Sequence, residues 1–244
     1  MGQAVSPANL SLHIYVRLSE RSRHLLWWAG DFARRPELPG MPDYRRRLPH
    51  FHPAGAYMFL TWRLWGTLPA RLGSIDLPPA GGTACPTPTF RDAFVVRDRA
   101  LDRCSSGPLW LRNADVANLV AEAILIGENE RCFYALCAWV VMPNHVHLLI
   151  LPQVAVQVLM RWLKGSTARR ANQILGRTGQ PFWQDESFDH YPRNARQIDR
   201  IATYIERNPV SAGLARSAEG WPWSSAGWLG SGAGRQAEPP APPE

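Results

Sequence analysis

The stretch Met142-Pro143-Asn144-His145-Val146-His147-Leu148-Leu149-Ile150 carries the strongest structural signal in this chain. Its apolar residues predict a buried β-strand that begins after a turn. Side chains alternate across a strand, so His145 and His147 leave one face while Val146 and Leu148 leave the other. At a rise of ~3.3 Å per residue the histidines are roughly 7 Å apart along the strand, which suits two ligands of one divalent cation. The spacing is equally typical of two polar residues on the solvent face of a half-buried strand.

The composition indicates a basic protein of ordinary domain size. The 244 residues include 27 Lys+Arg and 20 Asp+Glu, a formal net charge of +7, and Lys164 is the only lysine. A chain of this length can bury a sizeable core, and its charge favours a polyanionic partner such as nucleic acid. We find no apolar run of the ~18 residues that a membrane span needs, and no secretory signal. With four scattered cysteines, these features predict a cytoplasmic protein without a membrane partner.

Changes of composition divide the chain into three regions. Residues 1–54 form a basic, Pro- and Arg-rich extension, which could either hold a nucleic-acid backbone or pack on the domain. Residues 55–227 form the main domain, with a long loop or insertion at 70–105. The residues from 228 to 244 are Gly-, Ala- and Pro-rich, and we expect a disordered tail.

The order of apolar patterns predicts an α/β (α+β) sandwich. We expect a mainly antiparallel sheet with helices on one face, and the other face free to carry chemistry. The expected elements are a strand at 56–68, a helix capped by Asn113 and running to Gly127, a hairpin of strands 132–142 and 145–151, a helix at 154–175, and a helix from Asn194 to Asn208 that Pro209 ends.

The last of these helices places a tyrosine and an amide side by side. Tyr204 and Asn208 are four residues apart at the edge of an apolar stripe, so both side chains project in one direction. Taken alone, a tyrosine on an amphipathic helix is usually a packing residue.

Taken together, the motifs resemble the single-tyrosine HUH transposases of the insertion-sequence type, and most of all the REP-associated tyrosine transposases. The resemblance covers roughly residues 45–227. It implies a ferredoxin-like, HUH nuclease-type fold with the two histidines on a central strand and the tyrosine on a C-terminal helix facing them. The motifs are Arg47-Leu48-Pro49-His50, Phe59-x-Thr61-Trp62-Arg63-Leu64, Pro143-Asn144-His145-Val146-His147, Trp183-Gln184, Phe188-Asp189-His190, Tyr204-Ile205-x-x-Asn208-Pro209-Val210, Gly213-Leu214 and Trp221-Pro222-Trp223-Ser224-Ser225.

The same resemblance implies a function and a set of site residues. His145, His147 and Asn208 would bind a divalent metal, Mg²⁺ or Mn²⁺, although asparagine is shorter than the glutamine that some relatives carry. Tyr204 would be the nucleophile that cleaves single-stranded or hairpin DNA, such as palindromic repeats, through a 5′-phosphotyrosine. Because the covalent link conserves the bond energy for rejoining, no nucleotide cofactor is needed. A homodimer with shared active sites is left open.

Basic residues near these motifs are candidate DNA contacts, although each one taken singly is as typical of a solvated helix face. They are Lys164, Arg169, Arg170, Arg193, Arg196, Arg200 and Arg207.

Two other functions fit the same sequence. One is a domesticated DNA-binding protein that keeps the fold without strand transfer. The other is a metal-dependent phosphodiester hydrolase in which the histidine pair activates water and Tyr204 is structural.

Overall fold

The computed structural model describes residues 52–53, 55–67, 98, 100–102 and 107–228, together with the backbone of two short strands, β1 (Tyr44–Arg45) and β2 (Pro49–His50). The expectations for nearly all of the 1–54 extension, for most of the 70–105 segment and for the C-terminal tail beyond residue 228 lie outside the described residues.

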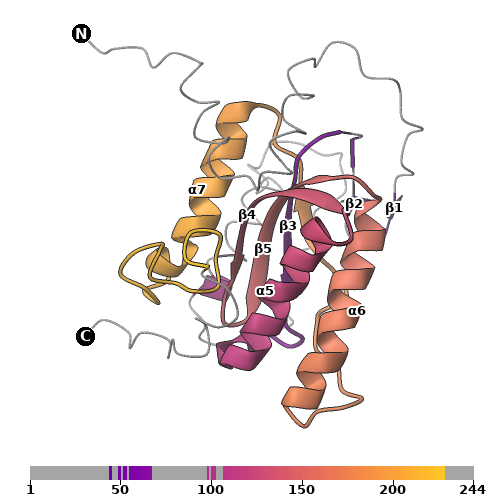
Figure 1. Cartoon of the computed structure of the whole chain (residues 1–244), viewed down its shortest axis with the longest axis vertical. Coiled ribbons are helices and arrows are strands. Elements are labelled where there is room, and N and C mark those ends of the chain that lie inside the picture. The colour runs from indigo at the N-terminus through magenta and orange to yellow at the C-terminus, as the bar shows by residue number, and fades with distance from the viewer. Residues whose placement is uncertain are drawn as a thin grey trace, which may run out of the picture.

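A four-stranded antiparallel sheet forms the centre of the domain (Figure 1). Its strands lie in the order β4-β5-β3-β6, and the chain runs β3-α5-β4-β5-α6-β6. This βαββαβ arrangement is the ferredoxin-like topology, so the predicted fold class is confirmed. The elements are β3 (Met58–Arg63), α5 (Ala114–Asn129), β4 (Tyr134–Val141), β5 (His145–Pro152), α6 (Val156–Ile174), β6 (Phe188–His190) and a last helix, α7 (Ala195–Ser211), with a short 3₁₀ helix, η1 (Trp110–Arg112), before α5.

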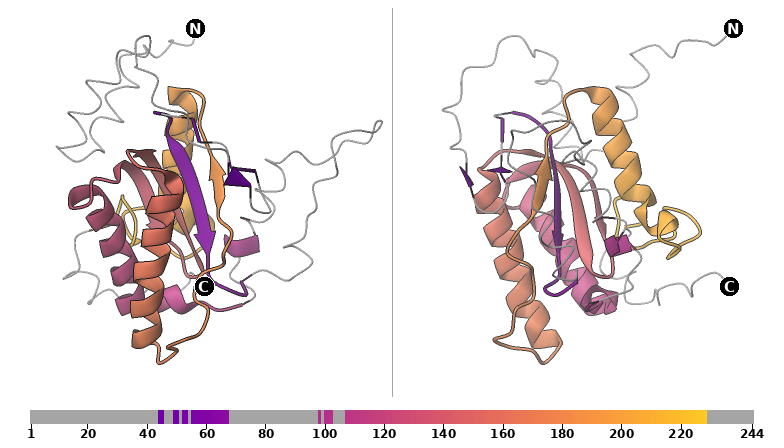
Figure 2. Two further views of the ribbon diagram at one scale, coloured as in Figure 1. Left: turned by 90° about the vertical axis from the view of Figure 1, so that its right-hand side faces the viewer. Right: turned by 180° about the vertical axis from the view of Figure 1, so that it is seen from behind.

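Helices lie on both sides of this sheet, whereas the apolar patterns predicted helices on one face and the other face free. The two helices α5 and α6 cover one face, and α7 lies on the other side, as the family resemblance implied for the tyrosine helix (Figure 2). The Tyr134 hydroxyl donates to the Ile124 carbonyl oxygen (2.7 Å), which ties β4 to α5. Both faces are therefore covered, and all eight residues of β4 and the first six of β5 are buried.

The predicted hairpin around Pro143-Asn144 is confirmed. The Met142 amide donates to the His145 carbonyl oxygen (2.8 Å), and β4 and β5 pair in antiparallel register on either side. On its other edge β5 pairs with β3, which places Thr61 opposite His147. The sequence stretch with the two histidines is thus a central strand, bonded on both edges.

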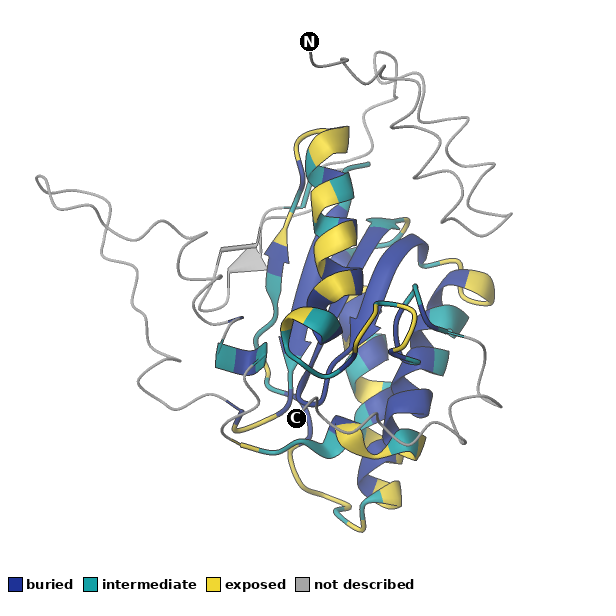
Figure 3. Cartoon of the chain, turned by 90° about the vertical axis from the view of Figure 1, so that its left-hand side faces the viewer, coloured by how far each residue is buried: buried dark blue, intermediate teal, exposed yellow. Residues whose placement is uncertain are grey.

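The predicted helix starts are also confirmed. The Asn113 side chain accepts from the Asp115 and Val116 amides, and the Asn194 side chain accepts from the Gln197 amide. The four first-turn amides of a helix lack partners within the helix, and a side-chain oxygen at this position satisfies some of them. One side of α7 is exposed and the other buried, as Figure 3 shows.

The expectation that Pro209 ends the last helix is wrong. The helix continues through Pro209 to Ser211. A proline in the last turn removes one backbone donor without preventing the turn from closing. Closure comes from Gly213, whose φ of 71° lets its amide and that of Leu214 donate back to Val210 and Pro209.

The Trp-Pro-Trp-Ser-Ser motif packs at the edge of the sheet. The Trp221 indole donates to the Val141 carbonyl oxygen (3.0 Å), and the Trp223 indole donates to Asn118 Oδ1 (2.9 Å). Trp223 is fully buried, so this motif joins β4 to α5 and has a structural role.

Among the described residues, no helix has the length and hydropathy that a bilayer crossing requires.

Candidate metal and nucleophile site

His145 and His147 form the centre of the site. Both side chains are completely buried, and their Nε2 atoms lie 3.0 Å apart. Their shared face, predicted from strand alternation, is the one that α7 covers, since Asn208 Nδ2 of that helix lies 3.4 Å from His147 Nε2.

Asn144 sets the protonation of the first ring. Its amide nitrogen donates to the Leu101 carbonyl oxygen (3.0 Å), so its Oδ1 faces His145 Nδ1 at 2.6 Å. An amide oxygen only accepts, and therefore Nδ1 of His145 carries the proton and Nε2 presents a lone pair. This arrangement, a ring held through one nitrogen with the other free, is typical of histidines that bind metals.

Thr61 holds the second ring. Its hydroxyl lies 2.8 Å from His147 Nδ1, and the Phe59 ring stacks on the same imidazole with centroids 5.5 Å apart. Both residues come from β3, because the antiparallel register brings that strand beside His147.

Two carboxylates that the sequence analysis did not identify complete the cluster. Asp98 Oδ1 lies 3.4 Å from His147 Nε2, and Asp102 Oδ1 lies 3.6 Å from His145 Nε2. One ligand atom from each of the four residues can be chosen so that all lie within 4.8 Å of one another, close enough for the cluster to hold a metal ion. The only signal in the sequence was the four-residue spacing of Asp98 and Asp102 within a segment assigned to a loop.

Burial opposes charge on every member of this cluster. It raises the pKa of Asp98 to about 8, with the nearby Asp102 charge adding to the effect. Burial also raises the pKa of Asp102 to about 6, partly offset by a hydrogen bond from Asn208. Burial lowers the pKa of His145 to about 3, and burial together with His145 lowers the pKa of His147 well below its usual value. Both imidazoles are therefore neutral near pH 7, the form in which they bind metals.

Tyr204 stands at the open side of the cluster. Its side chain is 37% exposed, whereas Asn208, one helical turn later, is only 1% exposed. The Tyr204 ring lies 5.6 Å from the His147 ring and 6.4 Å from the Phe59 ring, measured between centroids. The structure thus brings together His145, His147, Tyr204 and Asn208, the four residues that the resemblance assigned to the active site.

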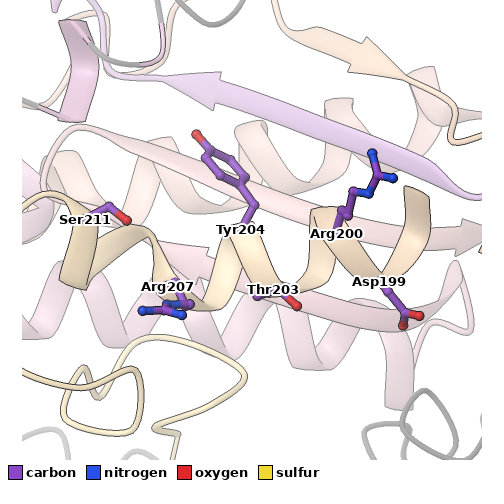
Figure 4. Close-up of a pocket in the computed structure, with 6 residues that line it drawn as sticks. All are labelled: Asp199, Arg200, Thr203, Tyr204, Arg207 and Ser211. Carbon is purple, nitrogen blue, oxygen red and sulfur yellow. The ribbon is translucent and has the colours of Figure 1, made fainter. Parts of the chain in front are cut away.

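The candidate DNA contacts do not gather on one surface. Arg200 and Tyr204 project to the same side of α7, while Arg207 projects to another (Figure 4). A pocket on this helix is lined by Asp199, Arg200, Thr203, Tyr204, Arg207 and Ser211.

The basic residues of α6 lie across the sheet from this pocket. Arg169 and Arg170 are exposed there, and the Lys164 ammonium donates to the Gln184 and Asp185 carbonyl oxygens (3.0 Å each). Lys164 therefore holds the segment between α6 and β6. The other two candidates, Arg193 and Arg196, are exposed near the start of α7.

Comparisons with known proteins agree with this site. Residues 114–208 match the family model described as "Transposase IS200 like". The chain is 28% identical over 108 residues to the REP-associated tyrosine transposase of Escherichia coli (strain K12), a match that covers 44% of this chain and 62% of that relative. The resemblance to the IS200-like and REP-associated tyrosine transposases is confirmed. The matched segment contains the histidine pair, Tyr204 and Asn208, whereas Asp98 and Asp102 precede it.

The chain is also similar to a solved structure, "Structure of the REP associates tyrosine transposase bound to a REP hairpin". The identity is 21%, the match covers 76% of this chain and 82% of that chain, and the TM-score is 0.47.

Proposed function

We propose that this protein is a metal-dependent transposase that cleaves and rejoins single-stranded or hairpin DNA through a 5′-phosphotyrosine on Tyr204. One observation carries the proposal: an exposed tyrosine ring lies 5.6 Å from a completely buried histidine whose Nε2 is 3.0 Å from that of a second histidine. A protein that only bound DNA would need neither the tyrosine in this place nor the histidine pair.

The chemistry is a phosphodiester exchange. The Tyr204 oxygen attacks phosphorus, a bond from that oxygen to phosphorus forms, and the bond from phosphorus to the 3′ oxygen breaks. The phenol gives up its proton, and the departing 3′ oxygen takes one up and leaves as a hydroxyl. Because one phosphodiester replaces another, the reverse attack by a 3′-hydroxyl rejoins the strand without a nucleotide cofactor.

The residues around the histidine pair fit a divalent metal. The two Nε2 atoms lie 3.0 Å apart, and the buried Asp98 oxygens and Asn208 Oδ1 have no hydrogen-bond partner. We propose His145, His147 and Asn208 as ligands of Mg²⁺ or Mn²⁺. When bound, such an ion supplies Lewis-acid polarisation of a phosphate oxygen.

The remaining groups of α7 suit a phosphate strand. Arg200 lies one turn before Tyr204 on the same side of the helix, where a guanidinium can pair with a phosphate or favour the phenolate. The name of the curated relative refers to REP elements. We therefore propose palindromic, hairpin-forming repeats as the DNA that this protein recognises.

The test is the covalent intermediate. Purified protein is incubated with end-labelled single-stranded hairpin DNA and Mn²⁺, and SDS-resistant protein–DNA adducts are measured by gel. We expect an adduct with the wild type, none with Tyr204→Phe, and DNA affinity within about two-fold of the wild type in that variant, because affinity comes mainly from phosphate contacts. Tyr191→Phe is the matched control, since Tyr191 stacks on His190 and not on His147.

The alternative functions give different results in the same experiment. A domesticated DNA-binding protein binds the hairpin and forms no adduct with any variant. A hydrolase cuts the strand without an adduct and keeps cutting after Tyr204→Phe. Either result would contradict the proposed phosphotyrosine.

A further inference from the structure

We propose that Asp98 and Asp102 are direct ligands of the metal, which adds two carboxylates to the ligands His145, His147 and Asn208. This inference deepens the proposed function, because it concerns the metal that the strand-transfer reaction needs. It adds ligands from a segment that precedes the part of the chain matched to the transposase family.

The two histidines are placed as adjacent ligands of one cation. Asn144 leaves His145 Nε2 without a proton, and this nitrogen lies 3.0 Å from His147 Nε2, which Asn208 Nδ2 approaches to 3.4 Å. Ligands about 2.1 Å from one ion and at right angles to each other lie ~3.0 Å apart, so the observed separation is that of two adjacent metal ligands.

The carboxylates complete the same set of donors. Asp98 Oδ1 is 3.4 Å from His147 Nε2, and Asp102 Oδ1 is 3.6 Å from His145 Nε2. His145 Nε2 has no hydrogen to give, so its contact with Asp102 is not a hydrogen bond with an ionised carboxylate. Asp98 is 3% exposed and both its oxygens lack a hydrogen-bond partner. An ionised carboxylate in this environment needs a cation.

The helical turn that carries the two carboxylates is fixed by its contact with Asn144. Asp98 and Asp102 are helical residues four apart, so their side chains leave the same side of one turn. Leu101, inside that turn, is buried, and its carbonyl oxygen accepts from Asn144 Nδ2. A single asparagine thus sets the His145 tautomer with one end of its amide and anchors the acidic turn with the other.

This donor set selects among metals. Two carboxylates match the double charge of the ion, so a buried site would be close to neutral overall. Imidazole is an unusual ligand for Mg²⁺, whereas Mn²⁺ accepts both imidazole and carboxylate. We therefore expect Mn²⁺ to bind more tightly than Mg²⁺.

Metal affinity of the full-length, chelator-treated protein tests the inference without any cleavage assay. Mn²⁺ binding is measured by titration calorimetry and by the electron paramagnetic resonance signal of free Mn²⁺. We expect Asp98→Asn and Asp102→Asn each to raise the Kd for Mn²⁺ by at least about 10-fold, in the 10- to 100-fold range or beyond that perturbing a metal site produces. Asp115→Asn, an exposed residue in the first turn of α5, makes the same chemical change outside the site and should leave the Kd unchanged.

Thermal unfolding separates a ligand from a structural aspartate. Without metal, Asp98→Asn replaces a buried carboxyl, whose charge burial already opposes, with a neutral amide of almost the same volume, so its Tm should equal or exceed that of the wild type. With saturating Mn²⁺ the wild-type Tm should rise and that of the variant should not. A lower Tm without metal together with an unchanged Mn²⁺ affinity would assign Asp98 to packing and overturn the inference.

The adduct assay keeps this inference distinct from the proposed function. If both aspartate variants bind Mn²⁺ as the wild type does while the Tyr204 adduct forms, the ligand assignment fails and the transposase proposal stands. If Mn²⁺ affinity depends on Asp98 and Asp102 but no adduct forms, the metal centre stands and the strand-transfer proposal fails. A wild type that binds no Mn²⁺ overturns the ligand assignment outright.

Discussion

Single polar residues decide the chemistry of this site. Asn144 lies in the hairpin turn and is almost completely buried, yet it contacts both a histidine ring and the backbone of the acidic turn. A turn asparagine is usually explained by its backbone preferences. Here both ends of its amide are used in side-chain bonds, so its role is to position His145 and Leu101.

For Asn208, an experiment can distinguish a role as a metal ligand from a purely structural role. Its Nδ2 lies 3.4 Å from His147 Nε2, and its Oδ1 has no hydrogen-bond partner although the residue is buried. We predict that Asn208→Ala raises the Mn²⁺ concentration for half-maximal adduct formation by about 10-fold, the scale of a lost metal-site contact, and leaves the adduct yield at saturating Mn²⁺ unchanged.

A purely structural Asn208 would behave differently in two measurements. The free energy of unfolding of metal-free Asn208→Ala would fall by about 1 kcal/mol, as for a lost hydrogen bond, and the Mn²⁺ dependence of adduct formation would match the wild type. Urea denaturation without metal supplies the first measurement and a Mn²⁺ titration of adduct yield the second.

At the scale of elements, the two sides of the sheet have separate tasks. The helices α5 and α6 close the core on one side, while α7 carries Tyr204 and Asn208 to the histidines on the other. The central strand β5 serves both sides, because alternate side chains leave opposite faces. A change confined to α5 should therefore alter stability without altering chemistry.

Asn113→Ala tests that separation. The Asn113 side chain accepts from the amides of Asp115 and Val116 at the start of α5. Its loss should lower the free energy of unfolding by about 1 kcal/mol, the usual effect of removing a helix cap, and leave the yield of the Tyr204 adduct unchanged. Urea denaturation and the adduct gel check the two halves. A loss of adduct with unaltered stability would show that α5 contributes to the site.

At the scale of the whole molecule, the site joins segments that are far apart in the chain. The acidic turn at 98–102, the hairpin at 142–147 and the last helix meet within a few ångströms.

The rest of the chain contributes charge: the net +7 includes Arg34 and Arg35 in the N-terminal extension. These arginines lie outside the described residues, and the prediction for them follows from the sequence alone.

Removing residues 1–43, a cut that stops before β1, should weaken DNA binding and flatten its dependence on salt. Each lost phosphate contact lowers the slope of log affinity against log salt by about 0.7 for single-stranded DNA. Fluorescence anisotropy at several salt concentrations measures the slope. His145→Ala serves as the control, since it should lose the adduct and keep the slope. An unchanged slope after truncation would assign the extension to packing.

Local patterns in the sequence determined most of the elements and the local placement of the site residues. The period of the apolar residues predicted β3, β4, β5 and the three long helices, but not β6 (Phe188–His190), and Asn113 and Asn194 marked two helix starts that the structure confirms. Strand alternation placed His145 and His147 on one face, and the helical repeat placed Tyr204 beside Asn208. These relations depend only on residues close together in the chain, so the sequence is sufficient for them.

The tertiary structure alone decided which distant groups meet. Nothing local distinguishes Asp98 and Asp102 from solvated acids in a loop, because their burial against the histidines arises only when the segment packs onto the sheet. The continuation of α7 through Pro209 likewise depends on the closure at Gly213, and the separation of the α6 arginines from Tyr204 depends on which face each helix covers. Such features follow from long-range packing, in which the free energy of burying one segment is set by residues far away in the sequence.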